Sequence, residues 1–212
     1  MISRQKIFFY KMTTDNGGAP TVSGTLLSLA ICKPMIRSSA RKGSIIFGFG
    51  ARSTIGERLI YIAEVTDKLF SGNYYKKDEY KNRKDCIYYW QKERLIWKPD
   101  SLYHSDGSEI LRDVGMPPHD KAKVLLSINF RYLGNKGTED YKDKYPAIAG
   151  AVFKLGQGHR VNHSKMLYSE LLKLKREIWE QYPDEKVIGA PIDSDTSKIC
   201  SGCEGKIATM HC

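Results

Sequence analysis

The stretch LSLAICKPMIRSSARKGSIIFGFG, residues 27–50, decides which fold the chain can have. It opens with an apolar run that predicts a strand, and then enters a basic turn that contains Lys33, Arg37 and Arg41. A second apolar run leads into a GxG at Gly48 and Gly50. A glycine pair after a strand is typical of dinucleotide-binding folds, but glycines also serve close approaches between strands.

The spacing after the glycines excludes the dinucleotide fold. Its fingerprint needs G-x-G-x-x-G at the start of a helix, so that the pyrophosphate meets the helix N-terminus. Here the next strand is expected from about Leu59, and no helix fits between it and Gly50. The chain has no G-x-x-x-x-G-K-[ST] motif either. We therefore predict a wide loop between antiparallel strands, and no bound cofactor.

Composition narrows the class of protein. The 212 residues are 41% hydrophobic, which suffices for one sizeable core. No apolar run approaches the ~20 residues of a membrane-spanning helix, and MISRQKIFFYKM lacks the pattern of a signal peptide. Five scattered cysteines favour a reducing compartment, so we expect a soluble cytoplasmic protein. The net charge of +10 favours polyanionic partners, although acids interleave with many of the lysines.

Apolar periodicity predicts one α+β domain over residues 1–193, followed by an irregular cysteine-containing tail over 194–212. Strands are expected at 6–12, 26–32, 44–49, 59–66 and 124–132, and an amphipathic helix at 164–182. Residues 35–41 have room for one helical turn. An aromatic-rich insertion of short helices is expected at 70–98, a turn between extended pieces at 102–110, and a polar loop at 136–144.

The order strand, basic turn, Lys-Gly, strand, loop and IAEV strand resembles the PUA-like superfamily, which includes the EVE, ASCH and YTH groups. The resemblance implies a mixed, mostly antiparallel pseudo-barrel that encloses a small ligand. Ser44 stands where that pattern usually has aspartate, which weakens the motif but not the predicted strand.

A closer resemblance covers nearly the whole chain. It rests on seven blocks in order: DNGGAP (15–20), LAICKPMIRSSARKGSIIFGFG (29–50), IYIAEV (60–65), YHSDG (103–107), VLLSINFRYLG (124–134), GQGH (156–159) and GAPID (189–193). Together they resemble a nucleotide modification associated domain family of bacteria and phages. The resemblance implies a role beside DNA base modification, with nucleic acid or a nucleotide, above all modified DNA, as the partner.

The basic turn supplies the first candidate ligand groups. Lys33, Arg37 and Arg41 follow a buried strand, where cations can hold a nucleotide phosphate or the DNA backbone. The alternative is a solvated basic turn in which Arg37 pairs with a nearby acid.

Two histidines and a loop supply the polar edge of the predicted pocket. The histidines are His104 and His159, and the loop contributes Asp15 and Asn16. Gly158 is also a candidate, because a glycine beside His159 lets a ligand approach the backbone closely. Each histidine taken alone is more often structural, so this prediction depends on the fold bringing these residues together with Lys33.

Aromatic residues offer a stacking surface. Trp90, in a cluster with Tyr88, Tyr89 and Trp97, is a candidate for covering a base, although most of this cluster is expected to be core.

Three functions remain open. The leading one is a module that recognises a modified base or nucleotide. The second is an enzyme acting on a nucleotide or modified base, for which Lys33 and Glu64 are the candidate catalytic residues by analogy with ASCH-type amidohydrolases. The third is a structural partner in a modification or defence complex, which predicts an exposed aromatic patch and no enclosed pocket.

The tail has part of a zinc pattern in Cys200, Cys203, His211 and Cys212. The spacer is short and the last two are adjacent, so we expect no metal there.

Overall fold

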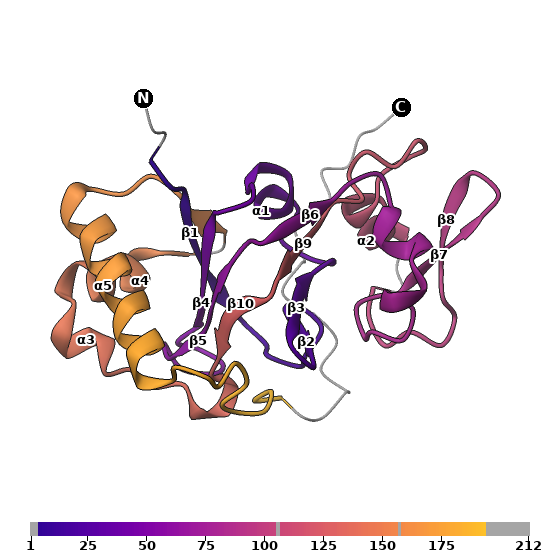
Figure 1. Cartoon of the computed structure of the whole chain (residues 1–212). Helices are drawn as coiled ribbons and strands as arrows, with labels where there is room; N and C mark the ends of the chain where they lie inside the picture. The colour runs from indigo at the N-terminus through magenta and orange to yellow at the C-terminus, as the bar shows by residue number, and fades with distance from the viewer. Residues whose placement is uncertain (1–3, 105–106, 157, 194–212) are drawn as a thin grey trace.

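The computed structural model describes residues 4–104, 107–156 and 158–193, and this part of the chain forms two main sheets, a two-stranded ribbon and helices (Figure 1). The five-stranded sheet has the order β10–β5–β4–β1–β11, with strands Asn129–Tyr132, Leu59–Glu64, Ile45–Gly50, Ile7–Met12 and His159–Arg160. The four-stranded sheet has the order β2–β3–β9–β6, with strands Thr21–Ser23, Leu26–Leu29, Val124–Ser127 and Asp67–Leu69. The ribbon pairs β7 (Tyr88–Gln91) with β8 (Arg94–Trp97).

The two main sheets are joined where the chain runs from β5 into β6 and, beside it, from β9 into β10. β5 pairs with β10 in one sheet and β6 pairs with β9 in the other, both antiparallel. The bend lies at Ser127, whose hydroxyl donates to the Glu64 carbonyl at 2.7 Å, and at the exposed Ile128. β10 and β11 remain the outer strands of the five-stranded sheet, so the described residues form no closed barrel.

Helices cover the outer face of the five-stranded sheet. They are α3 (Tyr141–Lys144), α4 (Pro146–Lys154) and α5 (Lys165–Gln181), seen on one side of the molecule in Figure 1. The predicted amphipathic helix is confirmed as α5. Ser164 caps it by accepting a hydrogen bond from Leu167 N at 3.2 Å, and Leu167, Leu171 and Leu174 are buried against the sheet.

Shorter helices connect the remaining strands. α1 (Pro34–Ser39) follows β3, and α2 (Gly107–Asp113) precedes β9. Three 3-10 helices, η1 (Asn73–Lys76), η2 (Asp78–Tyr80) and η3 (Gly134–Lys136), complete the described elements. None of the helices within the described ranges is long and apolar enough to cross a bilayer.

Three apolar clusters hold these layers together. One lies between the two main sheets, and a second lies between the five-stranded sheet and α3–α5. The third joins the four-stranded sheet to residues of the 70–124 region, including Tyr74, Tyr75 and Tyr88. Full burial of such large side chains contributes about 1.5–3 kcal/mol each, before conformational entropy is subtracted.

The wide loop predicted between antiparallel strands is confirmed, but the glycines themselves lie in β4, where they allow close packing. β4 and β5 are antiparallel neighbours joined by a loop. A Cβ atom at Gly48 would lie 2.3 Å from the Tyr61 ring, and one at Gly50 would lie 1.9 Å from the Gly56 carbonyl oxygen. Both positions therefore require glycine because another chain segment occupies the space of a side chain.

Several predicted elements differ from the structure. The single strand expected at 124–132 is two strands, β9 and β10, which belong to different sheets. The turn expected at 102–110 gives way to α2 from Gly107 onward, and the 70–98 insertion contains a β-ribbon as well as short helices. α4 was not expected at all. Its alanines and glycine leave a weak periodic pattern, and its burial comes from contact with α5 and the sheet.

Candidate functional site

The turn between β3 and α1 has an unusual backbone. Cys32 and Lys33 adopt φ values of 56° and 42°, a left-handed region that side chains other than glycine avoid. Such residues cost about 1–3 kcal/mol each and persist where surrounding contacts fix them. Arg37 provides one of these contacts, because its Nε donates to the Cys32 carbonyl at 2.7 Å.

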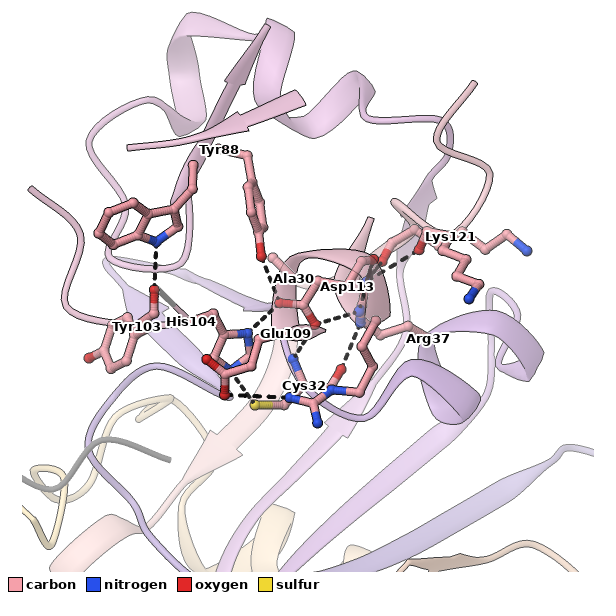
Figure 2. Close-up of polar contacts among 12 residues, drawn as sticks. Ala30, Cys32, Arg37, Tyr88, Tyr103, His104, Glu109, Asp113 and Lys121 are labelled. Atoms are coloured by element: carbon pink, nitrogen blue, oxygen red, sulfur yellow. Dashed lines mark hydrogen bonds and ion pairs between the residues drawn. The ribbon is translucent and has the colours of Figure 1, made fainter. Parts of the chain in front are cut away.

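Asp113, at the end of α2, is the centre of a buried polar network (Figure 2). Its Oδ1 accepts from Cys32 N at 3.1 Å and from Arg37 Nη2 at 3.0 Å. Its Oδ2 accepts from the Tyr88 hydroxyl at 3.1 Å and contacts His104 Nδ1. The carboxylate is thus surrounded by donors on both oxygens, which fixes its position and offsets the cost of burying its charge.

His104 connects this carboxylate to a thiol. With Nδ1 directed at Asp113, the ring places Nε2 3.2 Å from Cys32 Sγ. A carboxylate at Nδ1 favours the proton on that nitrogen, which leaves the lone pair of Nε2 to accept the thiol proton. His104 itself has a φ of 54°, so three left-handed residues meet here. Thiol, imidazole and carboxylate are arranged in the order used by nucleophilic hydrolases and transferases.

A second group of side chains lies around Tyr10 of β1. Lys33 Nζ stands 4.7 Å above the centre of the Tyr10 ring, and the Tyr10 and Tyr61 hydroxyls are 3.0 Å apart. Burial, with smaller contributions from Tyr61, Cys32 and Asp15, raises the pKa of Tyr10. Partial burial and the charge of Lys33 lower the pKa of His159. Tyr10 is therefore within electrostatic range of Cys32 and Asp15, and Lys33 within range of His159.

Asp15 is a buried carboxyl in the DNGGAP loop. The Tyr132 hydroxyl donates to its two oxygens at 2.7 and 2.8 Å, and Ile192 N donates to Oδ2 at 3.3 Å. Burial raises the pKa of Asp15 to about 6, with the neighbouring charge of Asp193 acting in the same direction and the two hydrogen bonds opposing it. This group can therefore change protonation near neutral pH.

The DNGGAP loop also meets the segment that carries His104. The Tyr103 hydroxyl donates to the Asn16 carbonyl at 3.1 Å, and the Tyr103 ring lies so close to Gly18 that a Cβ atom there would be 2.8 Å from it. A cavity of about 630 Å³ adjoins the same loop, lined by Gly17, Tyr132, Lys84, Lys136 and residues 187–191 among others. Its volume is within the range of small-molecule sites.

Among the predicted ligand residues, His104 contacts Cys32, the residue before Lys33, and its neighbour Tyr103 contacts Asn16. Lys33 stands over the Tyr10 ring, and the charges of Asp15 and Lys33 act on Tyr10 and His159. Gly158 is exposed and immediately precedes His159 in β11. Arg41 is exposed in the loop before β4. Trp90 lies on β7, where its Nε1 donates to the Gly72 carbonyl at 3.1 Å and its ring meets Lys76 and His119.

Two placements correct the sequence analysis. Arg37 is fully buried, and its guanidinium donates to Cys32, Asp113 and Lys123, so that it holds the turn together instead of contacting phosphate. Glu64, the second candidate catalytic residue, makes its contacts with the helical layer and with β10. Its Oε2 lies 2.7 Å from Lys175 Nζ of α5 and 3.3 Å from Asn129 Nδ2, so it faces the helical layer.

The sequence analysis missed Cys32 and Asp113, and it placed Tyr88 in the core without its hydrogen bond to Asp113. Cys32 lies inside the CKPMIR block, directly before the cation Lys33. The signal that would have found it is the chain order Cys, His, Asp at positions 32, 104 and 113, which becomes meaningful only when the fold joins them.

The described residues contain no group of three or more histidine, cysteine or acidic side chains placed to hold a metal ion. The candidate ligands Cys200, Cys203, His211 and Cys212 lie outside the described residues. A family model described as Nucleotide modification associated domain 2 matches residues 4–198, which confirms the family resemblance of the sequence blocks. No curated protein and no solved structure matches the chain.

Proposed function

Because the chain belongs to the nucleotide modification associated domain 2 family, we propose that it binds a nucleotide or a modified base of nucleic acid at the region around Tyr10. The observation that carries this proposal is the convergence of Lys33, His159, His104 and the Asp15–Asn16 loop. These groups come from segments far apart in the chain, and the sequence analysis made their meeting a condition of ligand binding.

Each group has a defined task in this proposal. Lys33 provides the cation for a phosphate, because its contact within the described residues is the Tyr10 ring and no acid there neutralises it. His159, whose pKa is lowered, is neutral at physiological pH and can donate to or accept from a base edge. The cavity beside Gly17 is also lined by Tyr132, whose hydroxyl binds Asp15, and we infer that it takes the remainder of the nucleotide. The net charge of +10 attracts nucleic acid over longer distances.

We further infer that the two bent sheets correspond to the PUA-like pseudo-barrel that the sequence resembles, opened rather than closed. The buried thiols of Cys32 and Cys86 agree with a reducing, cytoplasmic compartment.

Titration with matched modified and unmodified oligonucleotides at two salt concentrations tests the binding proposal. We expect the modified oligonucleotide to bind more tightly at both salt concentrations, and Lys33→Ala to weaken binding about tenfold. Lys42→Ala is the matched control, since Lys42 is an exposed lysine in the loop that follows α1. Equal binding of both oligonucleotides, with equal losses in the two variants, would show attraction by net charge only and would overturn the proposal.

A further inference from the structure

We propose that Cys32 and His104 are catalytic residues, positioned by Asp113, and that they cleave an amide-type C–N bond on the bound ligand. The thiol is the nucleophile and the imidazole is its base. The ligand class rests on the proposed function above, whereas the reactivity of the thiol does not. The two can therefore fail separately.

Geometry is the first support. Cys32 Sγ is 3.2 Å from His104 Nε2, within the hydrogen-bond reach of a sulfur donor. Asp113 holds the opposite nitrogen of the ring, and Arg37, Tyr88 and the Cys32 amide hold Asp113. The base therefore cannot turn away from the thiol without breaking a buried network.

Backbone conformation is the second support. Cys32 and His104, which provide nucleophile and base, both occupy left-handed conformations. Cys32 also lies in a short turn from β3 into α1, the kind of strained strand-to-helix connection that presents a nucleophile in other hydrolases.

The surrounding charges are the third support. Lys33 follows the nucleophile directly, and Arg37 lies behind Asp113. Arg112, the residue before Asp113, has two buried guanidinium nitrogens, Nε and Nη2, without a hydrogen-bond partner among the described residues; its closest acid is Glu109, with Nη2 3.6 Å from Oε1. Other titratable groups that face the network are Tyr88, Tyr10 and Tyr75, the last within range of Arg37 and Asp113. Cations near a thiol favour the thiolate and can hold the negative charge of a tetrahedral intermediate.

The reaction is balanced with water as the only co-reactant. The Sγ–C bond forms as the thiol proton passes to His104 Nε2. The C–N bond then breaks, and the same proton goes to the leaving amine. Water attacks the resulting thioester while His104 takes its proton, and the acid leaves as that proton returns to sulfur. The sum is hydrolysis of an amide to an acid and an amine, with the thiol regenerated.

Alkylation of the full chain by iodoacetamide, resolved by residue with mass spectrometry, tests the thiol. Cys86 is the internal reference, because the two thiols are similarly buried, with exposed fractions of 6% and 4%, and Cys86 contacts Lys98 instead of a histidine. We expect Cys32 to react at least about tenfold faster than Cys86 in the native protein. Equal rates would overturn the proposal.

The pH dependence of the Cys32 alkylation rate is a second test, and its main result comes from the wild-type protein. An ordinary thiol with a pKa near 8.5 loses about 200-fold in rate between pH 9 and pH 6. We expect Cys32 to lose less than about tenfold, and His104→Gln to restore the ordinary dependence. Asp113→Asn should shift the profile toward the ordinary one, which a merely structural carboxylate would not do. An unchanged Cys86 rate shows that each variant is still folded, and an ordinary profile for wild-type Cys32 would overturn the proposal.

The substrate class is tested with an oligonucleotide that contains N6-acetyladenine. We expect release of acetate and a transient acetyl group on Cys32, both absent in Cys32→Ala. A fast-reacting Cys32 without acetyl transfer from a bound oligonucleotide would overturn the amide assignment. A fast-reacting Cys32 with no oligonucleotide bound would overturn the proposed function instead.

Discussion

Asp113 and Asp85 are two fully buried carboxylates in neighbouring parts of the molecule, and each lies beside a tyrosine, an arginine and a cysteine. Asp85 accepts from the Ser28 hydroxyl at 2.5 Å and from the Tyr74 hydroxyl at 2.7 Å, and Arg83 Nε is 3.7 Å away. Burial raises the pKa of Asp85, so this carboxylate is more easily protonated and can then lose its negative charge.

The Asp113 network differs from the Asp85 network in the side chains that contact the carboxylate. Its arginine, Arg37, contacts the carboxylate directly at 3.0 Å and is as fully buried as Asp113. It also includes a histidine that reaches a thiol, and left-handed residues at both of those positions. The comparison teaches that two equally buried carboxylates can differ in their outermost contacts: Asp85 ends in hydroxyl groups and a distant arginine, whereas Asp113 reaches a thiol through an imidazole, a group able to move a proton.

Asp113→Asn and Asp85→Asn should separate the two networks most strongly. Loss of the Asp113 charge leaves the Arg37 cation buried without its counter-charge, so we expect about 3–5 kcal/mol lower free energy of unfolding. For Asp85→Asn we expect about 1–2 kcal/mol, because Arg83 also donates to the Thr21 and Leu26 carbonyls. Urea denaturation of both variants measures the difference, and equal losses would remove this distinction between the networks.

Asp15 extends the comparison to a buried carboxyl without an arginine among its described contacts. Its pKa rises from 3.8 to about 6 on folding, chiefly because it is buried. The folded protein therefore binds this proton more tightly than the unfolded chain. The stability it contributes is complete below pH 3.8 and is lost as the pH rises through about 6.

The expected loss is up to about 3 kcal/mol, from 1.36 kcal/mol per pKa unit. Unfolding free energies of wild type and Asp15→Asn, measured from pH 4 to pH 7, give the contribution as the difference between two curves. Parallel curves would show that Asp15 titrates at its ordinary pKa.

Tyr88→Phe and Tyr74→Phe provide the most closely matched test, with the smallest expected difference between the two networks. Each removes one hydroxyl that donates to a buried carboxylate, so each should cost about 1.5–3 kcal/mol. We expect similar losses of stability in the two variants, measured by denaturation under the same conditions. A much larger loss of unfolding free energy for Tyr88→Phe would show that the two networks differ in their tyrosines and not in the contact between His104 and Cys32.

The sequence predicts the parts of the fold that depend on local pattern. β1, β4, β5 and α5 follow from apolar runs or helical spacing, and the loop between β4 and β5 follows from the lack of room for a helix. VLLSINFRY is predicted as one strand because nothing in its composition marks the bend at Ile128. The ribbon β7–β8 is missed because its aromatic residues pair across a hairpin whose partner strand begins only three residues later.

The candidate site is less predictable because its contacts are long-range. Lys33, His104, His159 and Asp15 were selected as types of residue, and only the fold could place them together. Cys32 is separated from His104 by 72 residues and Arg37 from Asp113 by 76. No local pattern records a pairing over such distances, so neither the Cys32–His104 contact nor the burial of Arg37 could be predicted from the sequence.

The C-terminal segment that follows α5 returns to the beginning of the chain. Asp15 N donates to Asp193 Oδ2 at 2.9 Å, Asp193 N donates to the Asp15 carbonyl at 3.0 Å, and these two residues are 178 positions apart. During synthesis, the DNGGAP loop must therefore wait until residue 193 has left the ribosome before it acquires these partners. Contacts of such high order close late and slowly. A nascent chain thus carries an incompletely bonded DNGGAP loop until residue 193 has been made.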